Sequence, residues 1–368
     1  HMIVHPEDIL YHLEKALYMA VTGRPGPVWL DIPLDVQGAV IETENLRAYD
    51  PTENPEQKPQ EISQEIIEKI LDKIEESHRP VLSPGNGVRL AGAIGEFHEL
   101  VELLGVPVVT GMSSVDALES DHPYFAGRSG GTGTRAGNFA LQNSDVLLSI
   151  GNRQGFTQTG FQYQDWARES YTILNDIDEN ELKKPSLHVS LPVVGDAGEL
   201  IRGLLTEAKK RGADKGHPLF KGEDWRNQCL LWREKYPVVT QKHYETQEEG
   251  CTNIYVFYEE LSKAMKEDQN LMVSVGTSRV AGSQAFQVKK GQRFITNPNT
   301  ASMGFCLPAA TGIAVAQPGK PVVCVTGEGS LQMNIQEMQT IRHNHLPVKL
   351  FVINNQGYHS IRQTQQSY

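Results

Sequence analysis

Two oxygen-bearing side chains follow two apolar runs in the last part of the chain. Glu328 comes shortly after the β-branched run 321–326, and Asn355 follows the apolar run 347–353. The first run predicts a buried strand, and the second predicts another apolar strand. If these strands are parallel neighbours, Glu328 and Asn355 lie at the same carboxyl edge of one sheet, where open α/β sheets bind ligands. Carboxylate and amide oxygens are ligands that Mg²⁺ prefers, so the pattern predicts a magnesium site that could hold a diphosphate.

Glycines separate the first of these strands from a predicted helix. Gly327 and Gly329 flank Glu328, and glycine lets a backbone pass close to a bound group. Apolar residues then recur at spacings of three and four, which predicts a helix. They are Leu331, Ile335, Met338 and Ile341. A glycine turn of this kind also suits a plain strand–helix–strand unit with no ligand.

A second candidate turn lies earlier in the chain. The predicted strand 271–275 ends at Gly276, Thr277 and Ser278. Such a turn could present backbone N–H groups and hydroxyls to an anion at the N-terminus of the following helix.

These motifs resemble a known family. The string GEGS at 327–330, the 27 positions from Glu328 to Asn355 and the pair Asn354-Asn355 look like the thiamine diphosphate motif of the acetolactate synthase and 2-oxo acid decarboxylase family. The family usually has Asp where this chain has Glu328, which keeps the charge and adds one methylene. The resemblance implies thiamine diphosphate and Mg²⁺ as cofactors, with Glu328, Asn355 and the backbone carbonyl of Gly357 as metal ligands.

The segment 297–316, NPNTASMGFCLPAATGIAVA, resembles the family segment in which a methionine lies under the cofactor and bends it. Met303 stands at that position and is the residue to which the resemblance gives a catalytic role. The carbonyl of Ala301 would accept a hydrogen bond from the aminopyrimidine. The alternative for Met303 is a core-filling role, the commonest one for methionine. The implied cofactor contacts are Gly276, Thr277, Ser278, Ala301, Ser302, Met303, Gly327, Gly329 and Ser330.

Alternating strand and helix patterns predict an α/β fold with doubly wound parallel sheets. Residues 1–45 resemble the C-terminal remnant of a pyrimidine-binding domain, through the string GRPGPVWLDIPLDVQ, with a helix at 7–20 and a buried strand at 28–32. Residues 57–210 are expected to form a central Rossmann-like domain. Residues 225–368 are expected to form a diphosphate-binding domain that is truncated at its C-terminus. We therefore expect a fragment cut at both ends, preceded by the cloning scar His1-Met2.

The central region carries strings that resemble the family's middle domain, such as RPVLSPGNGV and SDVLLSIGNR. Strands are predicted at 79–83, 106–110, 145–150 and 171–177, and helices at 62–74, 91–104 and 191–211. Gly85, Gly87, Gly130, Gly131 and Gly133 could face a dinucleotide such as FAD. No GxGxxG string follows a strand here, so a vestigial site with loop-shaping glycines is preferred, and FAD is possible but not favoured. In the last region a helix is predicted at 253–266 and a strand at 294–297.

Composition excludes several other classes. The 368 residues are 39% hydrophobic and 21% charged, which is typical of a globular protein. A net charge of −11 without a basic cluster argues against a nucleic-acid partner, and no apolar run reaches the length of a membrane helix. The four scattered cysteines contain no CxxC pair, so we expect reduced, mostly buried thiols in a cytoplasmic protein.

The resemblance implies decarboxylation or carboligation of a small 2-oxo acid by a homodimer or homotetramer. In the family, a glutamate of the pyrimidine domain activates the cofactor, and that part is missing, so this fragment alone is expected to be inactive. Thr157 and Thr364 stand where acetolactate synthases usually carry Arg and Trp, which leaves a related carboligase or decarboxylase open. Two alternatives from other classes are an FAD- or NAD-binding oxidoreductase and a non-catalytic relative of the same fold.

Overall fold

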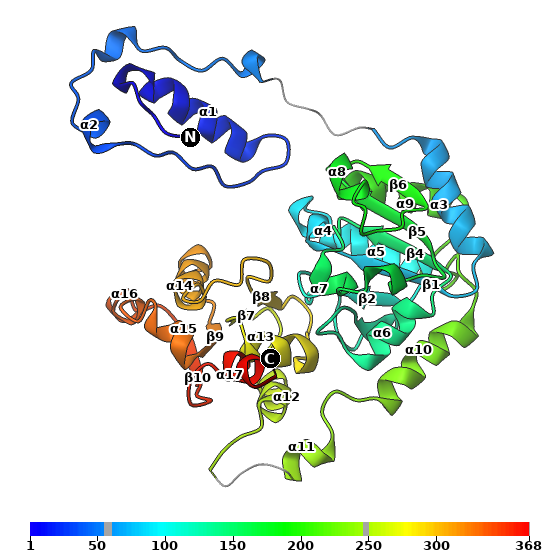
Figure 1. Cartoon of the computed structure of the whole chain (residues 1–368). Helices are drawn as coiled ribbons and strands as arrows, with labels where there is room; N and C mark the ends of the chain where they lie inside the picture. Colours follow the sequence, from blue (N-terminus) through cyan, green and yellow to red (C-terminus); the bar gives the residue numbers. More distant parts are fainter. Residues whose placement is uncertain (55–60, 246–249, 368) are drawn as a thin grey trace.

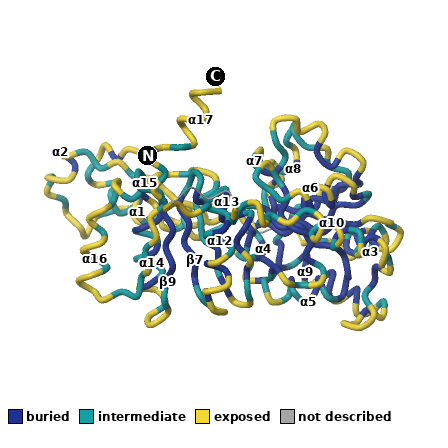
Figure 2. The backbone as a smooth tube through the Cα atoms, turned by 90° about the horizontal axis from the view of Figure 1, so that it is seen from below, coloured by how far each residue is buried: buried dark blue, intermediate teal, exposed yellow. Residues whose placement is uncertain are grey.

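Two sheets, each composed only of parallel strands, form the body of the molecule in the computed structural model (Figure 1). The structure describes residues 1–54, 61–245 and 250–367. Figure 2 shows that buried residues concentrate in the two sheets and the helices against them, whereas α17 is exposed. The predicted α/β class with parallel sheets is confirmed. None of the helices in the described ranges is both long and apolar enough to span a membrane.

The N-terminal segment contains two α-helices and three single-turn 3₁₀ helices. They are 3₁₀ Pro6–Asp8, α1 Ile9–Val21, α2 Leu34–Gln37, 3₁₀ Thr43–Asn45 and 3₁₀ Pro51–Glu53. The predicted buried strand at 28–32 is wrong. The segment forms only an isolated bridge between Met2 and Asp31, and Trp29 is 76% exposed. An extended, apolar run becomes a buried strand only where a neighbouring strand and a covering layer exist, and the described chain supplies neither here.

The central sheet has the strand order β3-β2-β1-β4-β5-β6, which is a doubly wound arrangement with its switch point between β1 and β4. Its strands are β1 Pro80–Pro84, β2 Val108–Thr110, β3 Phe125–Arg128, β4 Val146–Ile150, β5 Tyr171–Asp176 and β6 Leu191–Val194. Its helices are α3 Gln64–Glu76, α4 Asn86–Leu90, α5 Ile94–Leu104, α6 Arg135–Gln142, α7 Phe156–Thr159, α8 Glu179–Leu182 and α9 Ala197–Lys210, with a 3₁₀ turn at Tyr163–Asp165.

The helix predicted over 191–211 is wrong in its first part, because Leu191–Val194 is strand β6 paired with β5. Asp196 then begins α9 by accepting hydrogen bonds from the N–H groups of Gly198 and Glu199. Because the capping aspartate fixes the start of the helix, residues 191–194 cannot belong to it. Strand β3 was not predicted at all, since four residues containing a glycine and an arginine give little apolar pattern.

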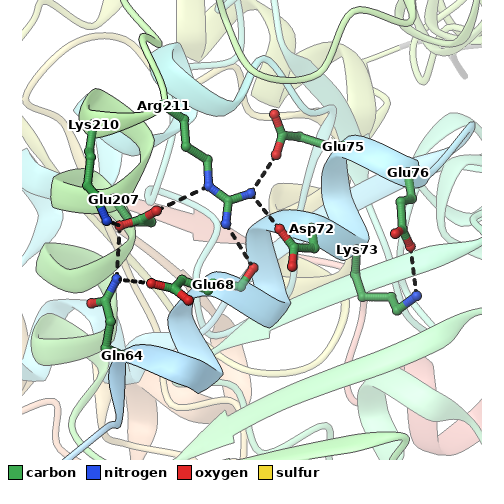
Figure 3. A network of polar contacts seen from close by, with 9 residues as sticks. All are labelled: Gln64, Glu68, Asp72, Lys73, Glu75, Glu76, Glu207, Lys210 and Arg211. Carbon is green, nitrogen blue, oxygen red and sulfur yellow. Dashed lines mark hydrogen bonds and ion pairs between the residues drawn. The ribbon is translucent and has the colours of Figure 1, made fainter.

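Arg211, just after α9, holds this helix against α3 (Figure 3). Its Nη1 lies 2.7 Å from Asp72 Oδ1 and 2.5 Å from Glu75 Oε2, and its Nε lies 3.3 Å from Glu207 Oε1. Nη2 also donates to the carbonyl of Glu68 at 3.3 Å. The guanidinium fork thus joins two turns of α3 to α9.

Helices α10 Glu223–Lys235 and α11 Gln241–Glu245 lead to the second sheet, here called the C-terminal sheet, whose strand order is β10-β9-β7-β8. Its strands are β7 Asn270–Val273, β8 Arg293–Ile295, β9 Val322–Gly327 and β10 Val348–Ile353. Its helices are α12 Ile254–Ala264, α13 Thr277–Ala285, α14 Cys306–Ala316, α15 Glu328–Gln332, α16 Glu337–His343 and α17 His359–Ser367.

The two faces of the C-terminal sheet bury alternate residues, as the two-residue period of a strand requires. Leu271 and Val325 belong to the cluster formed with α12 and α13. Met272 and Cys324 belong to the opposite cluster, formed with α14. The sheet therefore has helices on both faces, and its strand ends are free to carry a site.

The helix predicted from the spacing of Leu331, Ile335, Met338 and Ile341 is divided into α15 and α16. Asn334 lies in the break, and its side-chain amide donates to the carbonyl of Gly304 at 2.9 Å. A side chain engaged elsewhere competes with continuous helix formation. The predicted apolar face is also not buried, since Ile335 is 50% exposed and Met338 47%.

Candidate functional site

The carboxyl ends of β9 and β10 bring two predicted metal ligands together. Gly327 pairs with Ile353 in the parallel register, so the residues after both strands leave the sheet at the same level. Glu328 Oε1 accepts a hydrogen bond from the backbone N–H of Gly357 at 2.7 Å. Residues 29 positions apart in the chain are thus in direct contact.

Asn355, the other predicted ligand, has a side-chain oxygen with an unusual environment. Its Oδ1 is buried and has no hydrogen-bond partner in the described part of the protein. Arg362 Nη2 donates to the backbone carbonyl of Asn355 at 2.8 Å, which ties the loop to α17. A buried acceptor without a partner is costly, and a cation would satisfy it.

The backbone that follows Asn355 is held in the left-handed region. Gln356, Gly357 and Tyr358 have φ values of 62°, 91° and 47°. This conformation is strained for the non-glycine residues Gln356 and Tyr358, and such strain concentrates at binding sites. Across the described ranges, no group of three or more His, Cys, Asp or Glu side chains could hold a metal. The candidate site instead combines one carboxylate with an amide oxygen and a backbone carbonyl, a donor set that suits a hard cation.

The turn after β7 lies beside this loop. Gly276 has φ 71° and ψ −144°, which only glycine adopts readily, and it begins α13. Thr277 Oγ1 lies 3.2 Å from Ser360 Oγ, so the N-terminus of α13 adjoins the region after Asn355. The N–H groups at the start of this nine-residue helix therefore lie near Ser360, five positions after Asn355.

Ser330 joins three segments of the site. Its Oγ accepts from the N–H of Gly304 at 2.9 Å and from Ser274 Oγ at 2.9 Å. Ser274 follows β7, whereas Gly304 follows Met303. The family resemblance implies a cofactor contact for Ser330, and in the structure its hydroxyl connects the side chain of Ser274 to the backbone of Gly304.

The segment 301–304 is fixed by its backbone. Ala301 has φ 53° and Gly304 has φ 84°. A Cβ on Gly304 would lie 2.8 Å from Cβ of Met333, so only glycine fits there. Met303 is 36% exposed at this edge, which does not suit the alternative role of core filler.

Sequence reasoning missed Ser274, Asn334 and Tyr358. A Cβ on Gly329 would lie 2.9 Å from Cε1 of Tyr358, so the ring packs onto the glycine turn. Ser274 could have been found, because it lies near the carboxyl end of the predicted strand 271–275, just before the glycine turn. Asn334 contacts Gly304 and Tyr358 contacts Gly329, and no local sequence pattern predicts contacts between residues so far apart in the chain.

A separate cavity of about 650 Å³ lies at the carboxyl edge of the central sheet. Three arginines line it, and each is paired with a carboxylate at 3.0 Å or less. Arg24 pairs with Asp178, Arg153 with Glu181 and Arg293 with Asp116. Burial raises the pKa of Asp176, which also lines the cavity.

Two glycines that were predicted to face a dinucleotide, Gly85 and Gly87, pack closely against the loop at Gly151. A Cβ on Gly85 would lie 2.2 Å from the carbonyl oxygen of Gly151, and one on Gly87 would lie 2.7 Å from Cα of Gly151. The N–H groups of Gly85 and Gly87 donate to the carbonyls of Ile150 and Gly151. These two N–H groups lie at the switch point, where they could have bound a pyrophosphate, but both already donate to backbone carbonyls.

Comparison with known protein families gives two matches. Residues 67–204 match the family described as thiamine pyrophosphate enzyme, central domain. Residues 274–368 match the thiamine pyrophosphate enzyme, C-terminal TPP binding domain, and this range contains every residue of the candidate site.

Curated relatives match along nearly the whole chain. The acetolactate synthase isozyme 3 large subunit of Escherichia coli is 30% identical over 371 residues, covering 99% of this chain and 62% of the relative. The acetolactate synthase large subunit of Corynebacterium glutamicum is 31% identical, with 99% of this chain and 56% of the relative covered. A probable acetolactate synthase large subunit of Methanocaldococcus jannaschii is 32% identical, with 100% and 61% covered.

This chain thus spans about three-fifths of the length of these relatives. The chain therefore belongs to the thiamine pyrophosphate enzyme family, contributing its central and cofactor-binding domains, and is homologous to acetolactate synthase large subunits.

Proposed function

We propose that the natural protein containing this chain is a thiamine diphosphate- and Mg²⁺-dependent enzyme that decarboxylates a 2-oxo acid and can join the product to an acceptor, in the manner of an acetolactate synthase. One observation carries the proposal: Glu328 contacts Gly357, and nearby the buried amide oxygen of Asn355 has no hydrogen-bond partner among the described residues. These groups lie within the range that matches a thiamine pyrophosphate-binding domain.

When bound, thiamine diphosphate supplies the electron sink for decarboxylation of a 2-oxo acid. The residues of this chain anchor and orient it. Glu328, Asn355 Oδ1 and the carbonyl of Gly357 would hold Mg²⁺, which neutralises the diphosphate. Donors of the glycine turns would hold the phosphate oxygens. These are Gly276, Thr277, Ser278, Gly327, Gly329 and Ser330.

The segment 301–303 would position the organic part of the cofactor. The strained backbone of Ala301 presents its carbonyl as an acceptor, and Ser302 and Met303 are exposed beside it. A methionine thioether is apolar and adaptable, so it can support a ring without competing for its hydrogen bonds.

Substrate choice within the 2-oxo acids is left open by two departures from the acetolactate synthase pattern. Thr157 lies in α7, and its carbonyl accepts from the N–H of Gly131 at 2.9 Å. Thr364 lies on the exposed helix α17, with its hydroxyl bonded to the carbonyl of Ser360. We do not propose FAD as a cofactor. Each arginine of the central cavity is paired with a carboxylate, and the N–H groups of Gly85 and Gly87 in its loops already donate to backbone carbonyls.

The finer features of the enzyme follow from the same proposal. We expect a homodimer or homotetramer in the cytoplasm, where the four free cysteines stay reduced. The glutamate that activates the cofactor would lie outside these 368 residues. This chain by itself is then expected to bind cofactor without turning over substrate.

Isothermal titration of the natural full-length protein with thiamine diphosphate, with and without Mg²⁺, tests the proposal. Glu328→Gln should keep the fold, since strand burial does not depend on that charge. It should weaken Mg²⁺-dependent binding at least about tenfold, or about 1.4 kcal/mol.

Glu337→Gln is the matched control, because it neutralises a carboxylate on α16 outside the candidate ligand set. It should leave the affinity and its dependence on Mg²⁺ unchanged. An unaltered titration of Glu328→Gln would show that Glu328 is only a turn residue. Titration of the same sample with FAD separates the oxidoreductase alternative.

A further inference from the structure

Helix α13 has the candidate anion-binding turn at one end and the central domain at the other. Its N-terminus is the turn at Gly276, and its C-terminal residues, Gln284 to Phe286, contact residues that belong to the central sheet region. The helix is nine residues long, so it spans about 13 Å between the two. A displacement at its C-terminus would be passed along a rigid element to the turn.

Arg128, at the end of β3, makes the main contact with the C-terminal end of α13. Its Nη1 donates to the carbonyl of Gln284 at 3.1 Å, and its Nη2 donates to the carbonyl of Phe286 at 2.8 Å. Both carbonyls lie at the end of the helix, where the backbone dipole leaves partial negative charge. The planar fork of arginine suits two acceptors at once, which lysine cannot match.

The environment of Arg128 is unusual for a charged residue. It is 3% exposed, and within the described ranges no carboxylate lies close enough to form an ion pair with it. Burial and the neighbouring Arg233 lower the pKa of Arg128 to about 10, so it is still charged at neutral pH. A buried guanidinium without a carboxylate is expensive. Helix carbonyls are its compensating partners, which argues that the position of α13 matters to the protein.

A second set of contacts fixes the same place. Ser120 Oγ accepts from Arg128 Nη2 at 3.2 Å and from the N–H of Val288 at 2.9 Å. The N–H of Ser120 donates in turn to the carbonyl of Val288 at 2.9 Å. Gln284 Nε2 donates to the carbonyl of Gly133 at 3.3 Å. The C-terminal end of α13 is therefore attached to the central domain from several directions, with Arg128 at the centre.

We propose that Arg128 is a positioning residue for the candidate cofactor site, because it holds α13 from the central domain and so sets the place and order of the anion-binding turn 276–278. This inference rests on the proposed function, since it concerns the turn that would receive the diphosphate. It gives the central domain a role in cofactor binding that acts through the position of α13.

The test uses the natural full-length protein and two readouts. The first is the dissociation constant for thiamine diphosphate with Mg²⁺. Arg128→Met keeps most of the volume and removes the fork, and should raise the constant on the order of tenfold, within the range found for residues coupled to a site they do not touch. Arg128→Lys keeps the charge and one carbonyl contact, and should give an intermediate value.

The second readout is hydrogen exchange of the peptide spanning 276–285 without cofactor. It should be faster in Arg128→Met and less so in Arg128→Lys. The control is Arg211→Met, which removes a guanidinium fork of the central domain that contacts α3 and α9 (Figure 3). It should lower overall stability while leaving exchange in 276–285 and the dissociation constant unchanged.

The outcomes separate the two ideas. If wild type does not bind thiamine diphosphate, the proposed function fails, and the exchange readout still decides the role of Arg128. Unchanged exchange in 276–285 for a folded Arg128→Met overturns the positioning role. If that variant does not fold, Arg128→Lys decides: wild-type affinity and wild-type exchange would overturn the inference, and intermediate values would support it.

Discussion

Asn355 carries a buried amide oxygen that accepts no hydrogen bond from the described residues, beside a carboxylate that accepts one from Gly357. An acceptor in this state costs the folded protein the loss of its hydration, about 1–3 kcal/mol. The residue is therefore unfavourable for stability alone, which is expected where a side chain is kept for a ligand. The left-handed backbone of its neighbours Gln356 and Tyr358 is also unfavourable for the stability of the fold.

At this scale we expect Asn355→Ala to separate folding from binding. Without Mg²⁺ the free energy of unfolding should stay within about 0.5 kcal/mol of wild type or rise, because Oδ1 loses no hydrogen bond. With Mg²⁺, thiamine diphosphate affinity should fall about tenfold, or about 1.4 kcal/mol. Urea denaturation and titration of the full-length protein measure the two quantities. A loss above about 1 kcal/mol without metal would assign Asn355 to the fold instead.

At the scale of elements, Ser330 at the start of α15 connects the end of β7 to the backbone of Gly304. Two hydrogen bonds of 2.9 Å converge on one hydroxyl that is itself buried. The segment that carries Met303 is thus fixed relative to Glu328 by a residue two positions beyond Glu328. Packing of Tyr358 against Gly329 closes the same turn from the other side.

We therefore expect Ser330→Ala to lower the free energy of unfolding by about 1–3 kcal/mol, since the N–H of Gly304 loses its partner. Ser302→Ala, an exposed hydroxyl in the neighbouring segment, serves as the control and should change stability by less than about 0.5 kcal/mol. Chemical denaturation of both variants measures this. Equal stability of the two would mean that the Gly304 N–H finds another acceptor without Ser330.

At the scale of the whole molecule, large apolar side chains are exposed on the N-terminal segment. Trp29 is 76% exposed, Leu34 84% and Val40 99%. Phe351 and Val352 on strand β10, at the edge of the C-terminal sheet, are also exposed. Apolar surface of this kind is typical of regions that other parts of an assembly cover.

The corresponding prediction is that the natural full-length protein, with thiamine diphosphate and Mg²⁺, sediments as a dimer or tetramer. The physical reason is that cofactor anchor and activating glutamate would lie on different domains that meet across subunits. Analytical ultracentrifugation over a range of concentrations, combined with an activity assay on each fraction, tests it. An active monomer would contradict the prediction, and a run without cofactor shows whether assembly depends on it.

Local patterns in the sequence were enough to predict the fold class and to propose a candidate site at the carboxyl edge of the last sheet. Short apolar runs predicted β1, β2, β4, β5, β7, β8, β9 and β10, because apolar and β-branched residues in a short run are a local signal for a strand. Parallel neighbours then had to bring their carboxyl ends to one edge, so Glu328 and Asn355 could be paired across 27 positions. The residues of the glycine turns followed from the same reasoning.

Features that depend on distant partners became visible only in the folded chain. Residues 28–32 have the composition of a strand, but the described part of the chain offers them no sheet to join. Residues 191–194, in contrast, pair with β5 and form a strand. The Arg128 contact with α13 joins residues more than 150 positions apart, and no local pattern encodes it. A hydroxyl or guanidinium can serve many partners, and which one it meets is fixed by packing of the whole chain rather than by its neighbours in sequence.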